Sequence, residues 1–581
     1  MRLQYNGKQV YSRRGQQGCP LMMPMYCAMR KEMRGATPAG GKLSIQADYA
    51  DDGMDGGEPS DVLEVLKEEK VLAERYGARL NLTKMVVYIV GGEGVTDESL
   101  RGFEELGIKI DRSMNIVFMK APVHGSTEFL HDFWKNKMGE IRKTFDGIRK
   151  IKSRHIGLYL LRNCANVCRV VYYCRAVPRD MLSNLLDELD QELREVVEEV
   201  LGLTLQENQW AQATLPVRDG GLGLQEAREV ADAAYVSSRY MTLDGCKQLD
   251  PEHRWDGEDG MSAVGQALGR LGLPPEEGSK TSKQLVDALN KTKVQRLEDQ
   301  AGQVDKARLM AVRAPHAGAW LGAVPSRNLD LLMTNGEIRS RVGRRLGAAI
   351  GEEGPCPFCM QCNDEYGIHP ECCMGGGDKV TTRNMTRNTF HQHAKAAGAR
   401  PQLEQGGLLA GRGLPGGEGR RPADTLLCST EGIQAGRRRT RARIALDIGI
   451  VCPQAPSHRS EAVKEMLGAA ESYTRAKAAY EDTEAKCDEA GFEYQPIVFE
   501  SFGGMAREAE RVLKSINRQV AVNTNTPPEE VARRLWERLS VDLQRAGHRA
   551  FARRETTREF VVGSGMRGAL AGIEGLIRPS T

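Results

Sequence analysis

The chain has 581 residues, 40% of them hydrophobic and 27% charged, which is typical of folded globular protein and excludes a disordered chain. Its net charge of +3 argues neither for nor against a nucleic-acid partner, and its fourteen cysteines are too sparse for a disulfide framework. No apolar stretch approaches the roughly 20 residues that a membrane helix requires, and residues 1–14 lack the apolar segment of a signal peptide.

The N-terminal elements are short and are broken by glycine and proline. Residues 44–49 show some alternation of apolar and polar side chains and predict a β-hairpin with two aspartates at its tip. An apolar stripe over residues 61–77 predicts an amphipathic helix. The run KMVVYIV at 84–90 ends at two glycines and predicts a strand, and two further short strands are expected near Ile108 and at 116–119.

The middle of the chain, from 129 to 240, has helical periodicity, and its clearest helix is expected over residues 181–201. Residues 241–310 are polar and predict helices with loose connections. Five cysteines then fall between Cys356 and Cys373, a clustering that points to metal binding rather than to secretion.

The C-terminal third begins with a glycine-rich linker at residues 405–419. After it, the run ARIALDIGIV at 442–451 predicts a strand, residues 460–490 predict a helix, and residues 494–500 predict another strand. The last long helix is expected to open at TPPE, residues 526–529, with proline in its first turn.

The first candidate site is YADDG at residues 49–53. Its adjacent carboxylates, Asp51 and Asp52, can hold Mg²⁺ in a tight turn, because hard cations prefer oxygen ligands. Two adjacent aspartates by themselves are much more often a solvated acidic loop, so the surrounding segments decide.

Three ordered segments resemble the palm of a reverse transcriptase. GQQGCPL, at 15–21, is similar to the QG-x-PL segment of that family, and YADDG is similar to its two-aspartate hairpin. GARLNLTK, at 77–84, is similar to the G-x-x-LN-x-x-K segment that follows. The resemblance implies RNA-directed DNA synthesis, in which Asp51 and Asp52 bind Mg²⁺ (or Mn²⁺) that stabilises the attacking and leaving oxygens.

The same resemblance gives roles to three further residues. Gln17 and Gly18 would lie against the template and the incoming nucleotide, and Lys84 would lie near the nucleotide phosphates. The alternatives are a plain turn glycine at position 18 and a solvated strand end at position 84.

Later segments narrow the resemblance to the polyproteins of non-LTR (LINE-type) retrotransposons. In those proteins, helices after the palm hold the template–primer duplex, and this chain has similar sequences at 106–129, 160–182, 213–224, 233–240, 315–326 and 339–347. Polymerases of this family use three aspartates, one of them on a strand before the QG segment. Residues 1–14 contain no acid, so we expect an N-terminally truncated palm that does not polymerise DNA by itself.

The cysteine cluster predicts a zinc site. Its pattern resembles the CCHC segment of the same retroelement class and selects the ligands Cys356, Cys359, His369 and Cys373 for Zn²⁺. Cys362 and Cys372 remain as spares, and a group of incidental reduced cysteines is the alternative. The family's RHN triplet is replaced here by Arg383-Asn384-Met385.

Two C-terminal acids resemble part of a restriction-like endonuclease. Asp424 and Asp447 would be metal ligands and Lys477, on the following helix, would orient the attacking water. The pattern departs from the family's, because Asp424 stands in P-A-D and Asp447 has no lysine two positions on, and Lys486 competes with Lys477. Both acids are alternatively plain strand-end residues. The basic run GRRRTRAR, at 436–443, lies between them and suits either phosphate contacts or a solvated loop.

These observations predict an intracellular, nuclear, α+β multidomain protein that meets an RNA template and a DNA target. The resemblance implies a partial palm and helical thumb, a helical linker, a small zinc knuckle and an α/β restriction-endonuclease-like domain. Three functions stay open: a polymerase-family protein inactive by itself, a metal-dependent DNA endonuclease, and a non-catalytic nucleic-acid-binding protein. The expected domains are 1–125 (partial palm), 126–240 (thumb), 241–350 (linker), 351–400 (zinc knuckle), 401–510 (endonuclease-like) and 511–581 (C-terminal helices).

Overall fold

The computed structural model describes residues 2–5, 8–11, 22–49, 52–90, 94–274, 279–409, 422–433 and 443–574. Over these residues the chain is α+β, with many helices and small sheets, and it divides into two compact units. None of the helices in the described ranges is long and apolar enough to cross a membrane. Unit 1 comprises Met1–Lys137, Tyr173–Leu182 and Tyr235–Ser279, and unit 2 comprises Met138–Tyr172, Ser183–Ala234 and Lys280–Thr581.

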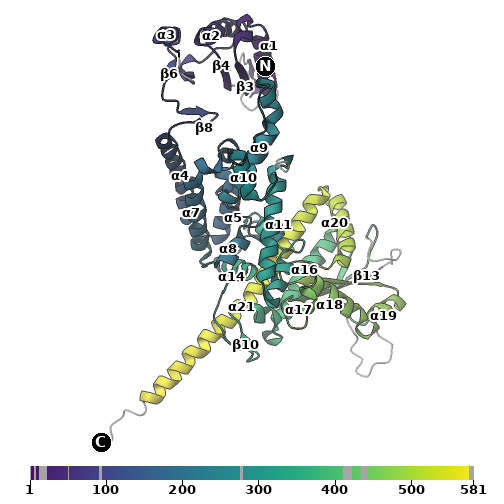
Figure 1. Ribbon diagram of the computed structural model, residues 1–581. Helices are drawn as coiled ribbons and strands as arrows, with labels where there is room; N and C mark the ends of the chain where they lie inside the picture. The colour runs from purple at the N-terminus through teal and green to yellow at the C-terminus, as the bar shows by residue number, and fades with distance from the viewer. Residues whose placement is uncertain are drawn as a thin grey trace. The chain divides into compact units, whose positions relative to one another are not determined.

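The described residues of unit 1 form four two-stranded sheets and several helices, labelled in Figure 1 where there is room. The strands are β1 (Arg2–Tyr5), β2 (Lys8–Tyr11), β3 (Ile45–Tyr49), β4 (Asp52–Gly56), β5 (Val86–Tyr88), β6 (Lys109–Asp111), β7 (Ile116–Phe118) and β8 (Ala121–His124). Its helices include α1 (Met22–Gly35), α2 (Pro59–Arg75), α3 (Asp97–Glu105) and α10 (Ala263–Leu271), and α4 (Thr127–Arg149), α6 (Val171–Ala176) and α9 (Ala227–Leu249) have residues in both units. The predicted helix over 61–77 is confirmed as α2, and the strand expected over 84–90 is the shorter β5.

The predicted aspartate hairpin is confirmed as β3 and β4, which pair antiparallel with Tyr49 opposite Asp52. An ionic cluster holds this hairpin against the neighbouring helices. Arg34 of α1 donates to Asp48 of β3 at 2.8 Å and also pairs with Asp55 of β4. The Arg34 side chain is 9% exposed, so these charge-assisted contacts are largely shielded from solvent and fix the hairpin in place.

The helical part of unit 2 follows the predicted periodicity. Helix α7 covers Ser183–Leu201, two residues shorter at its start than expected, and its apolar positions are buried. The other helices of this region are α5 (Arg154–Cys164), α8 (Glu207–Ala213), α11 (Ser282–Gln300), α12 (Gln303–Val312), α13 (Ala319–Gly322) and α14 (Asn335–Leu346).

A four-stranded sheet in unit 2 has the order β11-β12-β13-β14. Its strands are β11 (Pro401–Leu403), β12 (Thr425–Leu427), β13 (Ile444–Val451) and β14 (Glu493–Glu500), which confirms the strands expected at 442–451 and 494–500. Strands β11, β12 and β13 pair antiparallel, and β14 joins β13 in parallel. A parallel pair needs a crossover connection, which here consists of helices between β13 and β14.

The helix expected over 460–490 is wrong as a single element. The chain forms α17 (Arg459–Ala462), α18 (Gly468–Ala479) and α19 (Thr483–Glu489) instead. Leu467 has φ 68°, and Glu481 and Asp482 have φ 46° and 57°, so left-handed residues interrupt the helix at both joints.

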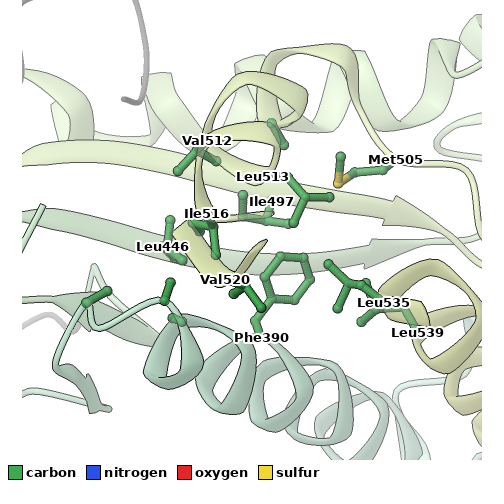
Figure 2. Packing of buried hydrophobic residues seen from close by; sticks show 14 of the residues in the cluster. Phe390, Leu446, Ile497, Met505, Val512, Leu513, Ile516, Val520, Leu535 and Leu539 are labelled. Atoms are coloured by element: carbon green, nitrogen blue, oxygen red, sulfur yellow. The ribbon is translucent and has the colours of Figure 1, made fainter. Parts of the chain in front are cut away.

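One face of the sheet packs on α16 (Asp378–Ala396), α20 (Glu510–Thr524) and α21 (Pro528–Glu574). Figure 2 shows the core between them, where Phe390, Val520 and Leu535 meet the strand residues Leu446 and Ile497. Helix α21 begins in the predicted Thr-Pro-Pro-Glu segment. Side chains alternate along a strand, so the intervening β13 residues face the other side, where α18 and α19 pack.

Candidate metal centres

The four predicted zinc ligands lie together in unit 2. One ligand atom from each of Cys356, Cys359, His369 and Cys373 falls within 4.8 Å of the others. Cys359 Sγ lies 3.3 Å from His369 Nε2 and 3.5 Å from Cys373 Sγ. Three thiolates and one imidazole at these separations match the donor set of a tetrahedral zinc site, so this cluster could bind zinc.

Local structure brings the cysteine cluster together. Strands β9 (Gly354–Pro355) and β10 (Cys362–Asn363) form a short ladder around the first two cysteines, and α15 (Ile368–Cys372) carries the histidine. The Asp364 carboxylate accepts the backbone N–H of His369 at 2.6 Å, which fixes the start of that helix. Burial disfavours the Cys356 thiolate, but hydrogen bonds from the Phe358 backbone and the His369 side chain outweigh it and lower the pKa of Cys356 to about 6.

The two spare cysteines lie outside the four-residue cluster. Cys362 is exposed and its thiol contacts Glu353 at 3.1 Å, and Cys372 forms a hydrogen-bonded pair with Cys452. The sequence pattern therefore selected the residues that converge.

Buried ion pairs fix the cysteine cluster to the surrounding helices. Glu371 of α15 accepts from Arg341 at 2.8 Å and from Arg344 at 3.0 Å. Burial by itself would raise the pKa of Glu371, but the charges of Arg344 and Arg341 outweigh it and lower that pKa to about 2. On the other side, Asp378 at the start of α16 pairs with Arg553 at 2.7 Å and Arg554 at 2.8 Å. These two pairs therefore fix the start of α16 against α21.

The C-terminal acids stand opposite each other on neighbouring strands. Thr425 of β12 pairs with Leu446 of β13, and the Asp424 backbone N–H donates to the Leu446 carbonyl at 2.9 Å. Asp424 is therefore the cross-strand neighbour of Asp447. The Asp447 carboxylate contacts α18, whereas the Asp424 carboxylate contacts α16 and accepts the Ile448 N–H at 2.8 Å.

Lys477 reaches Asp447 from α18. Its Nζ lies 2.7 Å from Asp447 Oδ2, which also accepts the Tyr494 hydroxyl at 2.5 Å. The competing Lys486 instead donates to the Glu481 carbonyl at 2.7 Å. Burial first, and then the Asp447 charge, raise the pKa of Tyr494, so this hydroxyl stays protonated as a donor.

The absence of a side chain at Gly449 allows Lys477 of α18 to reach Asp447. A Cβ at Gly449 would lie 3.0 Å from Lys477 Cε and 3.1 Å from Tyr473 Cε1, closer than ordinary contacts. The Lys477 stem therefore passes over the bare backbone two residues after Asp447. The Tyr473 ring supports the ammonium at 5.8 Å.

Arg383 is the main residue of this site to which sequence reasoning gave no role. It donates from Nε to Asp424 Oδ2 at 2.9 Å and pairs through Nη2 with Oδ1. Asp424 is 2% exposed and Arg383 is 43% exposed, so the guanidinium covers the carboxylate. The sequence signal that could have pointed to Arg383 was its position in the triplet Arg383-Asn384-Met385, which follows the cysteine cluster. Glu500 is buried elsewhere, against the start of α18, where it accepts the Ala470 N–H at 3.4 Å.

The predicted polymerase residues are only partly within the described ranges. Gln17, Gly18 and Asp51 lie outside the described residues. Asp52 is exposed as the first residue of β4, and Lys84 is exposed at the end of a 3₁₀ turn, Leu82–Lys84, before β5. Of the basic run, only Arg443 is described, with its guanidinium 5.8 Å from the centre of the Phe492 ring.

No protein-family model matches this sequence, and a search of curated proteins found no match.

Proposed function

We propose that this chain is a protein of the non-LTR retroelement class in which residues 401–510 act as a metal-dependent DNA endonuclease. The observation that carries the proposal is that Asp424 and Asp447 are cross-strand neighbours, with Lys477 Nζ 2.7 Å from Asp447 Oδ2. Two neighbouring carboxylates suit Mg²⁺ or Mn²⁺, which prefer oxygen ligands.

The residues around Asp447 have different roles in this proposal. Lys477 and Tyr494 both contact Oδ2 of Asp447, so they hold the orientation of that carboxylate. The Lys477 ammonium has two further protons with which to position an attacking water or a phosphate oxygen. A bound divalent ion would polarise the phosphate and lower the pKa of a water molecule. The Asp447 side chain is 16% exposed, so a substrate can reach it.

The cysteine cluster has a structural role in this proposal. Zinc held by the three thiolates and His369 would fix α15 and the start of α16, which carries Arg383. Cysteine-rich knuckles of this size also suit contacts with nucleic acid.

A second candidate function is that of a reverse-transcriptase-family protein that is inactive as a polymerase by itself. The supporting observation is the β3–β4 hairpin, which presents Asp52 exposed beside its turn. Asp51 and Asp52 would be two of the three carboxylates that the resemblance calls for. We therefore expect no primer extension from the 581-residue chain by itself, and extension that Asp51→Ala abolishes would overturn this expectation.

Cleavage of duplex DNA by the full chain tests the endonuclease proposal. We expect cleavage with Mg²⁺ or Mn²⁺, loss with EDTA, and a fall of at least about 10²-fold in Asp447→Asn and in Lys477→Ala. Asp482→Asn and Lys486→Ala are matched controls, since both side chains lie outside the site. Cleavage that persists in EDTA or survives Asp447→Asn would refute the proposal, and salt-dependent DNA binding without turnover would favour the non-catalytic function.

A further inference from the structure

Three of the four acceptor positions of the Asp424 carboxylate are filled, and Arg383 covers the carboxylate. Oδ2 accepts the Ile448 N–H at 2.8 Å and the Arg383 Nε–H at 2.9 Å, and Oδ1 pairs with Arg383 Nη2. The carboxylate is 2% exposed, and the residue that covers it, Arg383, is 43% exposed. A metal ion that binds Asp424 must therefore take the place of the guanidinium.

The two cations are alternatives because each neutralises the same buried charge. A buried carboxylate is costly without a counter-ion, which the two-pronged arginine contact supplies. Mg²⁺ and Mn²⁺ need a carboxylate oxygen at about 2.1 Å, well inside the space the guanidinium fills. The Asp447 charge also acts on Arg383, so both proposed ligands attract it.

Arg383 can leave because its side chain is 43% exposed. The buried side chains of α16 are Asp378, Thr386, Phe390 and Ala394, and Arg383 lies one turn before Thr386 on the same face, outside the apolar core that Phe390 and Ala394 join. Lys379 lies one turn earlier on the same side of α16 and is exposed. A released Arg383 therefore joins a second cation on the surface beside the site, an arrangement suited to phosphate oxygens.

We propose that Arg383 is a displaceable counter-ion of Asp424: the divalent ion replaces it on the carboxylate, and the freed guanidinium binds a DNA phosphate. This inference rests on the endonuclease site proposed above. Displacement makes metal binding and substrate binding cooperative, because the metal releases the Arg383 guanidinium, which then binds the phosphate.

The test measures Mn²⁺ binding by the zinc-loaded full chain, from the electron paramagnetic resonance signal of free Mn²⁺. Arg383→Gln removes the competing charge, so its Mn²⁺ affinity should rise about tenfold, the equivalent of one charge-assisted hydrogen bond. Arg387→Gln is the matched control: Arg387 lies one turn later and pairs with Glu404, not with the site, so its affinity should equal that of the parent chain. If Arg383 only supported the fold, Arg383→Gln would instead weaken metal binding.

The second readout is the salt dependence of duplex binding at saturating Mn²⁺. Losing one phosphate contact should reduce the slope of log affinity against log salt by about 0.9 in Arg383→Gln. Arg383→Lys keeps the positive charge but loses the two-pronged guanidinium contact, so it should give an intermediate Mn²⁺ affinity and an unchanged salt slope. If Arg383→Gln fails to fold, Arg383→Lys takes its place in the test.

The outcomes separate the two proposals. If Asp447→Asn abolishes Mn²⁺ binding but Arg383→Gln does not tighten it, the displacement is refuted and the metal site stands. An unchanged salt slope refutes the phosphate role. If Asp447→Asn leaves Mn²⁺ binding unaltered, the endonuclease site itself is refuted, and the displacement with it.

Discussion

Replacing Gly449 by valine should disable Lys477 without removing the carboxylates. The first added carbon would lie 3.0 Å from Lys477 Cε, 3.1 Å from Tyr473 Cε1 and 3.3 Å from Val498 Cγ2, and the two methyl groups extend further into that space. The flexible lysine is the neighbour that yields most readily. In the parent chain the Lys477 ammonium lies 2.7 Å from Asp447 Oδ2. We expect it to move away from that oxygen in Gly449→Val while the strand pairing persists.

The expected loss is that of one positioned charged group. Single-turnover cleavage should fall about 10²-fold in Gly449→Val, as in Lys477→Ala, whereas Mn²⁺ affinity should not fall, because both carboxylates remain. Overpacking should also cost about 1–3 kcal/mol of unfolding free energy. Ile448→Val is the control, because its side chain faces the opposite layer and its truncation costs only about 1 kcal/mol.

A double variant makes the reasoning refutable. If Gly449→Val acts only through Lys477, adding it to Lys477→Ala should cause no further loss. Multiplied effects, or a Gly449→Val chain that cleaves at the parent rate, would refute the role of the bare backbone. Gly449→Lys combined with Lys477→Ala should recover part of the activity, because strand positions two apart share a face.

Three further predictions concern the fold. Removing zinc by chelation, or through His369→Ala, should speed amide exchange at the start of α16, whereas Cys362→Ala should not, because Cys362 lies outside the cluster. Arg34→Met leaves the partly buried Asp48 and Asp55 without their shared partner and should cost about 2 kcal/mol, seen as faster exchange in β3 and β4, with exposed Arg101→Met as the control. Burial raises the pKa of Glu500 from 4.5 to about 7, so the folded chain keeps a proton that the unfolded chain releases. The unfolding free energy should therefore fall as pH rises from about 4.5 to about 7, by at most about 3 kcal/mol. Denaturant titrations at pH 5 and pH 8 should show this fall in the parent chain and not in Glu500→Gln.

Local sequence signals sufficed where one segment determines its own structure. The hairpin at 45–56 follows from alternation around a turn, β13 from an unbroken apolar run, and the start of α21 from proline in a first turn. The break after Met466 was missed because the left-handed residue there is Leu467, which carries no turn signal.

The candidate sites divide in the same way. The zinc ligands lie within eighteen residues of one another, so the resemblance of this one segment to a CCHC pattern selected them. The choice of Lys477 over Lys486 depends on how α18 docks on β13, and the pairing of Arg383 with Asp424 depends on how α16 approaches β12. Sequence could propose Lys477 only through resemblance, and it gave no reason to pair Arg383 with an acid 41 positions later.

The sheet that carries Asp424 and Asp447 is not a portable module. Its residues come from 401–500, but one whole face is closed by α16, α20 and α21, which precede and follow that stretch. A fragment cut to 401–510 would present Leu446, Ile448, Ile497 and Phe499 to water, and such an apolar surface favours aggregation. Grafting this candidate active site onto another protein, or exchanging it between relatives by recombination, would therefore have to carry α16 through α21 as one piece.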